Sequence, residues 1–265
     1  MITHQSIGYS GRLGNQMFQY AALKSVSLKT GFDCFLPNHL NIKYDGLFDF
    51  TNHKWIEYKL DLLDGFNLKC EITNTLPEKV YTEKHFTFDS EVFNISDNTS
   101  IDGYYQSYKY FEEYENEIRN EFQFKPEISH KCISEISKYP NPVAVHIRRG
   151  DYVKHPGFWV VTPEYLENAL QFFNDKEYTF LIFSDDIEWC KEIFPDGVVF
   201  IQGNSQFEDL CLMSLCEHNI ISNSTFSWWA AWLNTNPNKR IIAPNNWYTD
   251  PKPLYDLYPN NWIKI

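Results

Sequence analysis

The sequence predicts an α/β fold whose C-terminal half is a doubly wound, Rossmann-like parallel sheet. From about residue 143 to residue 243, short apolar runs rich in β-branched and aromatic residues alternate with segments of helical spacing. Strands and helices that alternate in this way form parallel sheets covered by helices on both faces. Several of the runs end in polar residues, and ligands of such sheets bind outside the carboxyl ends of the strands.

The order of elements in this half is regular. Thr162 and Pro163 mark one helix start, because threonine is favoured at the N-cap and proline at the first helical position. The expected strands are Val143–Ile147, Tyr178–Phe183, Val198–Ile201, Asn219–Ile221 and Arg240–Ala243. The expected helices are one beginning at Pro163 and those at Ile187–Phe194, Phe207–Cys216 and Phe226–Leu233.

The N-terminal half is expected to begin with a strand within Ile2–Tyr9. A glycine-punctuated loop follows, and a helix then carries Met17 to Val26, with Gly31 as its stop. The stretch Asp33–Thr99 shows no clear period, and we expect a mixed region of short strands, helices and loops there that carries variable specificity contacts.

Three further segments lead to the expected domain boundary. Ile101–Ser107 reads as a strand and turn, the aromatic and aliphatic stripe from Tyr110 to Phe122 as a helix, and Ile128–Ser137 as a short helix. We therefore expect two domains, residues 1–128 and residues 129–265.

Composition excludes several classes of function. The chain has 265 residues, 43% of them hydrophobic, with a net charge of −12 and a pI of about 5.1. Binding to nucleic acid or to an anionic membrane surface requires a basic face, which this balance disfavours. No apolar run approaches the roughly 20 residues of a membrane span, and the N-terminus lacks the pattern of a signal peptide. The six scattered cysteines favour reduced thiols in a cytoplasmic protein without a zinc site.

Two adjacent arginines follow the strand Val143–Ile147. The chain has five arginines, and Arg148 and Arg149 stand side by side, between His146 and Asp151. Arginine captures phosphate oxygens with two parallel hydrogen bonds. An exposed, salt-bridged pair is the alternative, but the position at a strand end favours a phosphate site.

Two other strand ends are polar. Ser184, Asp185 and Asp186 follow one strand, and residues 222–225 (Ser-Asn-Ser-Thr) follow another. Ser224 and Thr225 also fit a plain N-cap of the next helix, and the aspartates also fit a solvated turn. In a parallel sheet these ends share an edge, so we expect them to converge on one ligand, the aspartates facing a guanine or a ribose.

The first loop, Gly8–Gln16, precedes a helix. Backbone N–H groups at a helix N-terminus attract anions, although glycine turns before helices are also common without a ligand. Arg12 within the loop favours a ligand role.

Three motifs carry a resemblance to a known family. The segments Gly11–Gln16 (G-R-L-G-N-Q), His146–Tyr152 (H-I-R-R-G-D-Y) and Ser222–Trp229 (S-N-S-T-F-S-W-W) occur in the order found in α-1,2-fucosyltransferases of glycosyltransferase family 11. Gly103–Ser107 also matches a family segment. Arg12 departs from the family's usual Gly-Gly-Leu-Gly-Asn-Gln loop and is similar to the loop of protein O-fucosyltransferases.

The resemblance implies a GT-B fold, with two Rossmann-like domains facing a cleft. Residues 1–128 would form the acceptor-side domain and residues 129–265 the domain that binds GDP-fucose. It implies an inverting transfer of L-fucose from GDP-β-L-fucose to the 2-hydroxyl of a terminal β-galactoside. Arg148 would bind the pyrophosphate, supported by His146 and Arg149. Ser224, Thr225 and Phe226 would grip the β-phosphate and flank the guanine, and Asn15 would reach the donor from the other domain. The full set of expected donor contacts is Arg12, Gly14, Asn15, Arg148, Arg149, Ser184, Asp185, Asp186, Asn223, Ser224, Thr225 and Phe226.

The chemistry of the site leaves one role open. No Asp-x-Asp sequence occurs in the chain, so we expect no metal, and arginines and helix N-termini must stabilise charge on the departing GDP. Asp151 is the first candidate for the base that activates the acceptor. It equally fits a brace for Arg149 or His146, and a displacement without a strong base is a third option. The rival functions are α-1,6- or protein O-fucosyl transfer and a non-catalytic nucleotide-sugar-binding module.

Overall fold

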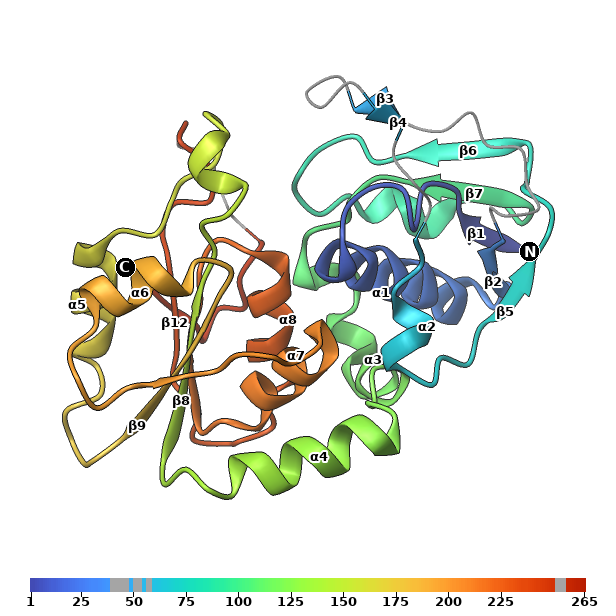
Figure 1. The fold of residues 1–265 in the computed structure, drawn as a ribbon. Coiled ribbons are helices and arrows are strands. Elements are labelled where there is room, and N and C mark those ends of the chain that lie inside the picture. The colour runs from blue at the N-terminus through green and yellow to red at the C-terminus, as the bar shows by residue number, and fades with distance from the viewer. Residues whose placement is uncertain (39–47, 50–53, 56–58, 251–255) are drawn as a thin grey trace. The chain divides into compact units, whose positions relative to one another are not determined.

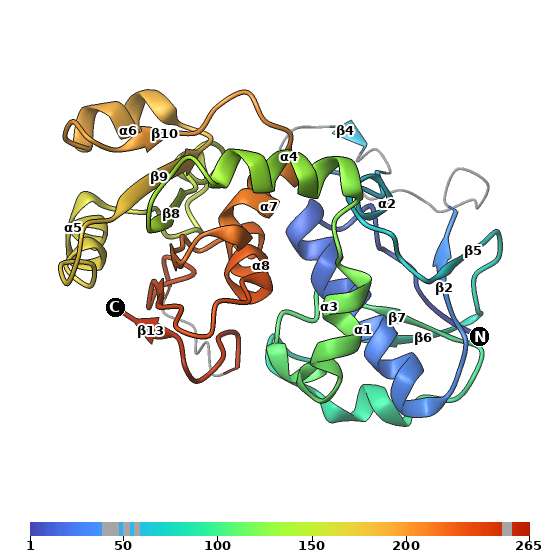
Figure 2. The ribbon, with the colours of Figure 1, turned by 90° about the horizontal axis from the view of Figure 1, so that it is seen from below.

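The computed structural model describes residues 1–38, 48–49, 54–55, 59–250 and 256–265. The chain divides into two compact units (Figures 1 and 2). Unit 1 begins with Met1–Gln123 and includes residues 256–259, whereas unit 2 begins at Phe124 and ends with Asn260–Ile265. The C-terminal residues are thus shared between the units.

Unit 1 contains a five-stranded parallel sheet. Its strands are β1 (Ile2–His4), β2 (Cys34–Pro37), β5 (Glu71–Thr73), β6 (Lys79–Thr82) and β7 (Thr99–Asp102). Their order is β5-β2-β1-β7-β6. A separate antiparallel pair joins β3 (Phe48–Asp49) to β4 (Lys54–Trp55). All pairings in this sheet are parallel, and the order in which the strands follow along the chain reverses between β1 and β7.

The strand β1 is central but only three residues long. Its polar side chains are buried and hydrogen-bonded: Thr3 Oγ1 donates to Phe35 O at 2.7 Å, and His4 Nε2 lies 3.0 Å from Gly103 O. These bonds explain how so polar a sequence occupies the middle of a sheet, because buried polar groups with partners carry little penalty. The strand expected within Ile2–Tyr9 is confirmed in its first part.

Helix α1 (Leu13–Thr30) follows the glycine loop and packs against the unit 1 sheet. It starts one turn before the expected Met17 and ends as predicted. Gly31 has φ 75°, and its N–H donates to Ser27 O at 2.8 Å. A residue with positive φ after a helix favours glycine, which has no Cβ to clash.

The remaining helices of unit 1 are short. They are α2 (Leu62–Gly65), η1 (Ser90–Asn94), η2 (Tyr108–Tyr110), η3 (Glu112–Tyr114) and α3 (Glu115–Glu121). The single helix expected from Tyr110 to Phe122 is therefore wrong in its first half, which forms 3₁₀ turns. At Phe111, between the two turns, the backbone has φ −133°, which interrupts an α-helix.

Unit 2 contains a six-stranded parallel sheet in the order β10-β9-β8-β11-β12-β13. The strands are β8 (Pro142–Ile147), β9 (Thr179–Ser184), β10 (Val199–Phe200), β11 (His218–Ile220), β12 (Ile241–Ala243) and β13 (Ile263–Lys264). By chain position this is the order third, second, first, fourth, fifth, sixth, as in dinucleotide-binding sheets, and the order reverses between β8 and β11. The five predicted strands are confirmed; β13 was not predicted.

Helices cover both faces of the unit 2 sheet, so the doubly wound prediction is confirmed. Figure 1 shows α5 (Pro163–Leu170) and α6 (Ile187–Ile193) on one face, and α7 (Gln206–Leu215) and α8 (Thr225–Leu233) on the other. Helix α4 (Pro126–Ile136) packs on α7, and the single turn η4 (Tyr152–Lys154) follows β8. The N-cap prediction at Thr162 also holds: its hydroxyl accepts the Tyr165 N–H at 3.2 Å.

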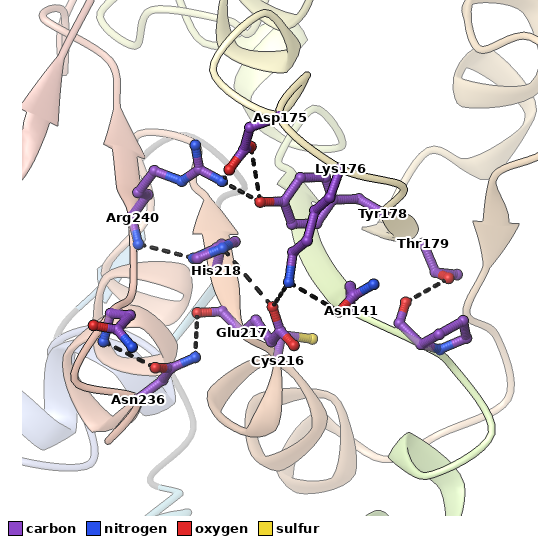
Figure 3. A network of polar contacts seen from close by, with 12 residues as sticks. Asn141, Asp175, Lys176, Tyr178, Thr179, Cys216, Glu217, His218, Asn236 and Arg240 are labelled. Carbon is purple, nitrogen blue, oxygen red and sulfur yellow. Dashed lines mark hydrogen bonds and ion pairs between the residues drawn. The ribbon is translucent and has the colours of Figure 1, made fainter.

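The amino ends of the unit 2 strands form a polar network (Figure 3). Arg240 Nη1 donates to Phe172 O at 2.6 Å, and Lys176 pairs with Glu217 at 2.8 Å. His218 Nδ1 accepts the Arg240 N–H at 3.0 Å, and burial lowers the pKa of His218. These groups are satisfied by one another, which fits a role in stability at the edge opposite the carboxyl ends.

Over the described ranges, no helix is both long enough and apolar enough to cross a membrane.

Candidate donor site at the carboxyl edge of unit 2

The side chains of His146 and Ser222 meet at the point where the strand order reverses. His146 lies on β8, Ser222 follows β11, and His146 Nδ1 is 2.8 Å from Ser222 Oγ. His146 is 7% exposed, and burial is the main cause that lowers its pKa, to about 3. The imidazole is therefore uncharged near neutral pH. It lines the site as a neutral hydrogen-bonding group and adds no positive charge.

Arg148 is held by two carboxylates and an aromatic ring. Its Nη2 lies 2.5 Å from Asp151 Oδ1, and its Nη1 lies 2.8 Å from Asp185 Oδ2. Its Cζ is 5.5 Å from the centroid of the Tyr152 ring. A guanidinium has five N–H donors, so these two ion pairs leave donors for a ligand. The side chain is 20% exposed.

Asp185 is built into the loop that follows β8. Its Oδ1 accepts the N–H groups of Arg149 at 2.8 Å and Gly150 at 3.1 Å. A Cβ on Gly150 would lie 2.6 Å from Asp185 Oδ2. Glycine in the Arg-Arg-Gly-Asp sequence thus makes room for this carboxylate. The carboxylate oxygens of Asp185 bond to Arg148, Arg149 and Gly150, and the expectation that Asp185 faces a guanine or a ribose stays a prediction.

Arg149 points to a different partner. Its Nε donates to Asp186 Oδ2 at 3.0 Å, and its Cζ stacks 3.8 Å from the Trp189 ring. Asp186 also caps α6 through Oδ1, which accepts the Trp189 N–H at 3.4 Å. Ser184 Oγ in turn accepts the Asp186 N–H at 2.9 Å. The Ser-Asp-Asp segment therefore orders both arginines, one aspartate for each.

The segment after β11 forms the N-terminus of α8. Ser224 is the N-cap residue, with extended backbone, and its carbonyl accepts the Trp228 N–H at 3.0 Å. Within the described chain its hydroxyl makes no capping bond to the helix, so the plain N-cap alternative lacks its main interaction. The Phe226 ring is 5.7 Å from the His146 ring. Asn223 is fully buried and binds two backbone carbonyls.

The loop before α1 in unit 1 has its own set of bonds. Gly11 has φ +91°, and a Cβ there would lie 2.1 Å from Asn15 Nδ2. Asn15 Oδ1 accepts from Gln106 Nε2 at 3.0 Å. Arg12 is the exposed N-cap residue of α1, and Gly14 is buried in its first turn. The loop is therefore shaped around the Asn15 amide.

Two glutamines close that loop onto the rest of unit 1. Gln19 Nε2 donates to Ser10 O and to Gly103 O, both at 3.1 Å. Gln16 Nε2 donates to Lys59 O at 2.8 Å, and its Oε1 accepts the Asp61 N–H at 2.9 Å. Gln16 is part of the first motif, and these two hydrogen bonds to the backbone at residues 59 and 61 are a structural reason for a glutamine at this position.

Unit 2 brings together most of the predicted donor contacts. Because β9, β8 and β11 are neighbours, their polar carboxyl ends share one edge, as predicted. Arg12, Gly14 and Asn15 belong to unit 1, and their donor role stays a prediction. Tyr152 and Trp189, which contact the arginines, were not among the predicted residues. The signal that could have identified them is an aromatic residue within a few positions of an arginine or aspartate at a strand end.

Among the described residues, no group of three or more His, Cys, Asp or Glu is arranged to hold a metal ion.

The chain is similar to known proteins over nearly its full length. The family model described as Glycosyl transferase family 11 matches residues 2–265. An α-1,2-colitosyltransferase of Escherichia coli is 32% identical, covering 97% of both chains. The Escherichia coli O-antigen biosynthesis glycosyltransferase WbnK is 31% identical, covering 97% of this chain and 98% of its own. The galactoside 2-α-L-fucosyltransferase SEC1 of Bos taurus is 27% identical, over 86% of this chain and 64% of its own.

Solved structures show the same fold. POFUT1 in complex with GDP-fucose has a TM-score of 0.52 at 13% identity, covering 91% of this chain and 97% of its own. The α-1,6-fucosyltransferase NodZ, soaked with GDP-fucose, has a TM-score of 0.50 at 13% identity, covering 88% and 90%. The predicted fold of two Rossmann-like units, of the GT-B type, is confirmed. The order of the motifs, the strand order of unit 2 and the match over residues 2–265 agree, and the chain belongs to glycosyl transferase family 11.

Proposed function

We propose that this glycosyltransferase moves L-fucose from GDP-β-L-fucose to the 2-hydroxyl of a terminal β-galactoside, with inversion and without a metal. One observation carries the donor assignment. Arg148, Arg149 and the N-terminus of α8 lie at the carboxyl edge of unit 2, around the position where the strand order reverses. Ligands of doubly wound sheets bind at this position, and guanidinium groups and helix N-termini bind phosphates.

The α-1,2 linkage rests on the relatives. The colitosyltransferase that is 32% identical carries α-1,2 in its name, and SEC1 of Bos taurus is named a galactoside 2-α-L-fucosyltransferase. The α-1,6 and protein O-linked alternatives have weaker support, because their structures resemble this chain at 13% identity. That degree of likeness concerns the fold alone.

The proposed reaction requires the site to stabilise the negative charge that develops on the departing GDP. As the glycosidic bond breaks, the β-phosphate gains negative charge, and N–H donors already in place lower the free energy of that state. Asp185 holds Arg148 from one side and Tyr152 packs along its face, so the guanidinium is ordered before a ligand arrives. Asp186 and Trp189 do the same for Arg149.

The acceptor hydroxyl must lose a proton during transfer. Asp151 is 54% exposed and touches Arg148 through Oδ1, a position that fits a brace and also leaves the carboxylate open to solvent. We propose Asp151 as the first candidate base. A brace, or a displacement with little base assistance, is the alternative.

A transfer assay tests the proposal. The enzyme is incubated with GDP-fucose and a panel of β-galactosides, with and without EDTA, and the product linkage is read by NMR. The expected result is an α-1,2 product whose rate EDTA leaves unchanged. Loss of activity in EDTA that is restored by a divalent cation contradicts metal independence. An α-1,6 product contradicts the linkage, and the same assay with an acceptor peptide tests the O-linked alternative. Binding of GDP in calorimetry without any turnover supports a binding module.

The relative of 32% identity suggests a second donor. Because its name specifies colitose, the assay includes GDP-colitose alongside GDP-fucose. A higher kcat/KM for GDP-colitose reassigns the sugar while leaving the nucleotide site and the α-1,2 linkage in place.

A further inference from the structure

We propose that Asn223 is a positioning residue, which ties two loops of unit 2 together beside Arg148 and thereby orders the donor site. This inference rests on the proposed function for its effect on GDP. Its structural part concerns Asn223 and two loops, residues 155–161 and 244–249.

The Asn223 amide joins the two loops directly. Its Nδ2 donates to Trp159 O at 2.7 Å and to Trp247 O at 2.8 Å. Carbonyl oxygens only accept hydrogen bonds, so both N–H groups of this amide are used and its orientation is fixed. The side chain is 0% exposed.

The same amide has an unpaired acceptor. Within the described chain, Asn223 Oδ1 is buried without a hydrogen-bond partner. A buried acceptor without a partner destabilises a fold. A hydrophobic side chain at this position would avoid the cost of the unpaired oxygen but could not donate to the two loop carbonyls. We therefore assign the two N–H bonds, rather than the filling of space, as the reason for an asparagine here.

The two loops then bind each other. The Thr249 N–H donates to Gly157 O at 3.1 Å, and Thr249 Oγ1 donates to Phe158 O at 3.1 Å. Phe158 and Tyr248 form an isolated antiparallel bridge, with ring centroids 5.9 Å apart and planes at 23°. We call the two joined loops, residues 155–161 and 244–249, the clamp. Asn223 holds the clamp through Trp159 O and Trp247 O, and the rings of Phe158 and Tyr248 stack within it.

The stack leads to the guanidinium proposed to bind the donor. The Phe158 and Tyr152 rings lie 4.3 Å apart with planes at 10°, and the Tyr152 ring lies 5.5 Å from Arg148 Cζ. A disturbance at Asn223 therefore passes through two rings to Arg148. Misplacing a binding group by about 1 Å has a large effect on a reaction, up to roughly a hundredfold.

The isosteric change Asn223→Asp tests the clamp. An ionised carboxylate cannot donate to either carbonyl, whereas a protonated one donates a single O–H. Asn219→Asp is the matched control. Asn219 is 1% exposed, and its Nδ2 also donates to a carbonyl, Met213 O at 2.8 Å, while its Oδ1 accepts from Asn234 Nδ2 at 2.8 Å. These partners lie outside both loops. Thr249→Val is the mild second variant, because Thr249 is exposed and the change removes only the side-chain bond between the loops.

Amide hydrogen exchange by mass spectrometry gives the first measurement. Faster exchange of residues 155–161 and 245–249 is expected in Asn223→Asp and, to a smaller degree, in Thr249→Val, but not in Asn219→Asp. Unchanged exchange in these segments in both Asn223→Asp and Thr249→Val overturns the clamp. If Asn223→Asp does not fold, Thr249→Val still decides the question.

Calorimetric titration with GDP gives the second measurement. We expect the Kd of Asn223→Asp to rise on the order of tenfold, and its ratio to the wild-type Kd to shrink between about pH 8 and about pH 6 as the carboxyl takes up a proton. An equal loss in Asn219→Asp, or looser loops with an unchanged Kd, overturns the positioning role. If wild-type protein does not bind GDP, the proposed function fails, and the exchange experiment still decides the clamp.

Discussion

Replacing Arg148 with alanine should reduce the rate of transfer far more than the stability of the fold. Its partners Asp151 and Asp185 are 54% and 29% exposed. Ion pairs with such exposure contribute roughly 0–1 kcal/mol each, so losing both lowers the free energy of unfolding by at most about 2 kcal/mol. Because domains are typically stable by about 5–15 kcal/mol, Arg148→Ala should remain folded.

The effect on transfer should be much larger. Removing one donor that stabilises developing charge costs about 3 kcal/mol, or roughly a hundredfold in rate. The transfer rate of Arg148→Lys should lie between those of wild type and Arg148→Ala. A lysine ammonium keeps the positive charge but lacks the planar fork with which Arg148 reaches both Asp151 and Asp185. Arg119→Ala is the matched control: Arg119 is 22% exposed and pairs with Glu115 on α3, outside the strand ends of unit 2.

Initial rates with GDP-fucose, together with thermal unfolding followed by circular dichroism, measure both quantities. A near wild-type rate in Arg148→Ala would refute the donor site. A similar loss of rate in Arg119→Ala would show that the effect is not specific to the strand end.

Three further predictions concern the same edge. Gly150→Ala should weaken GDP binding in calorimetry, because a Cβ 2.6 Å from Asp185 Oδ2 displaces that carboxylate; unchanged binding would contradict the packing. Wild-type protein should lose stability between pH 7 and pH 5, since unfolded imidazole binds a proton below its ordinary pKa of 6.5 and buried His146 does so only near a pKa of about 3. The loss attributable to this group is about 2 kcal/mol at pH 5, and urea unfolding of His146→Gln should show a correspondingly flatter profile. Asp151→Asn should abolish the limb of the pH–rate profile that rises with pH if Asp151 is the base, and an unchanged limb excludes that role.

Much of unit 2 was predictable because its signals are local. The β-branched run Val143–Ile147 and the Thr162–Pro163 helix start depend on neighbours within a few positions. By contrast, β13 is two residues long and pairs with β12, so its sequence carries no period to read. The helix expected from Tyr110 failed for the opposite reason, since its apolar spacing was helical while the backbone at Phe111 was not.

The polar strand ends were predictable as a group but not in their pairings. Asp185 bonds to backbone N–H groups that lie 35 and 36 positions away, and Asn223 bonds to carbonyls 64 and 24 positions away. Backbone groups occur at every residue, so no side chain in the sequence identifies them as partners. The parallel sheet with helices on both faces could be predicted because it follows from the alternation of strands and helices. The strand order, and which of the two neighbouring aspartates pairs with which arginine, came from the structure.

The charges at the donor edge show how an acidic protein can bind an anion. Arg148 and Arg149 contribute +2, and their partners Asp151, Asp185 and Asp186 contribute −3, so this cluster carries a net charge of −1. The phosphate binding proposed there must depend on N–H groups aimed in fixed directions, because the cluster has no excess of positive charge. Asp185 is held by two backbone N–H groups besides Arg148, whereas Asp151 is the more exposed partner. A diphosphate that takes the Nη2 donors of Arg148 therefore competes with Asp151 and leaves Asp185 in place. That competition would release the Asp151 carboxylate from Arg148, as the proposed role of Asp151 as base requires.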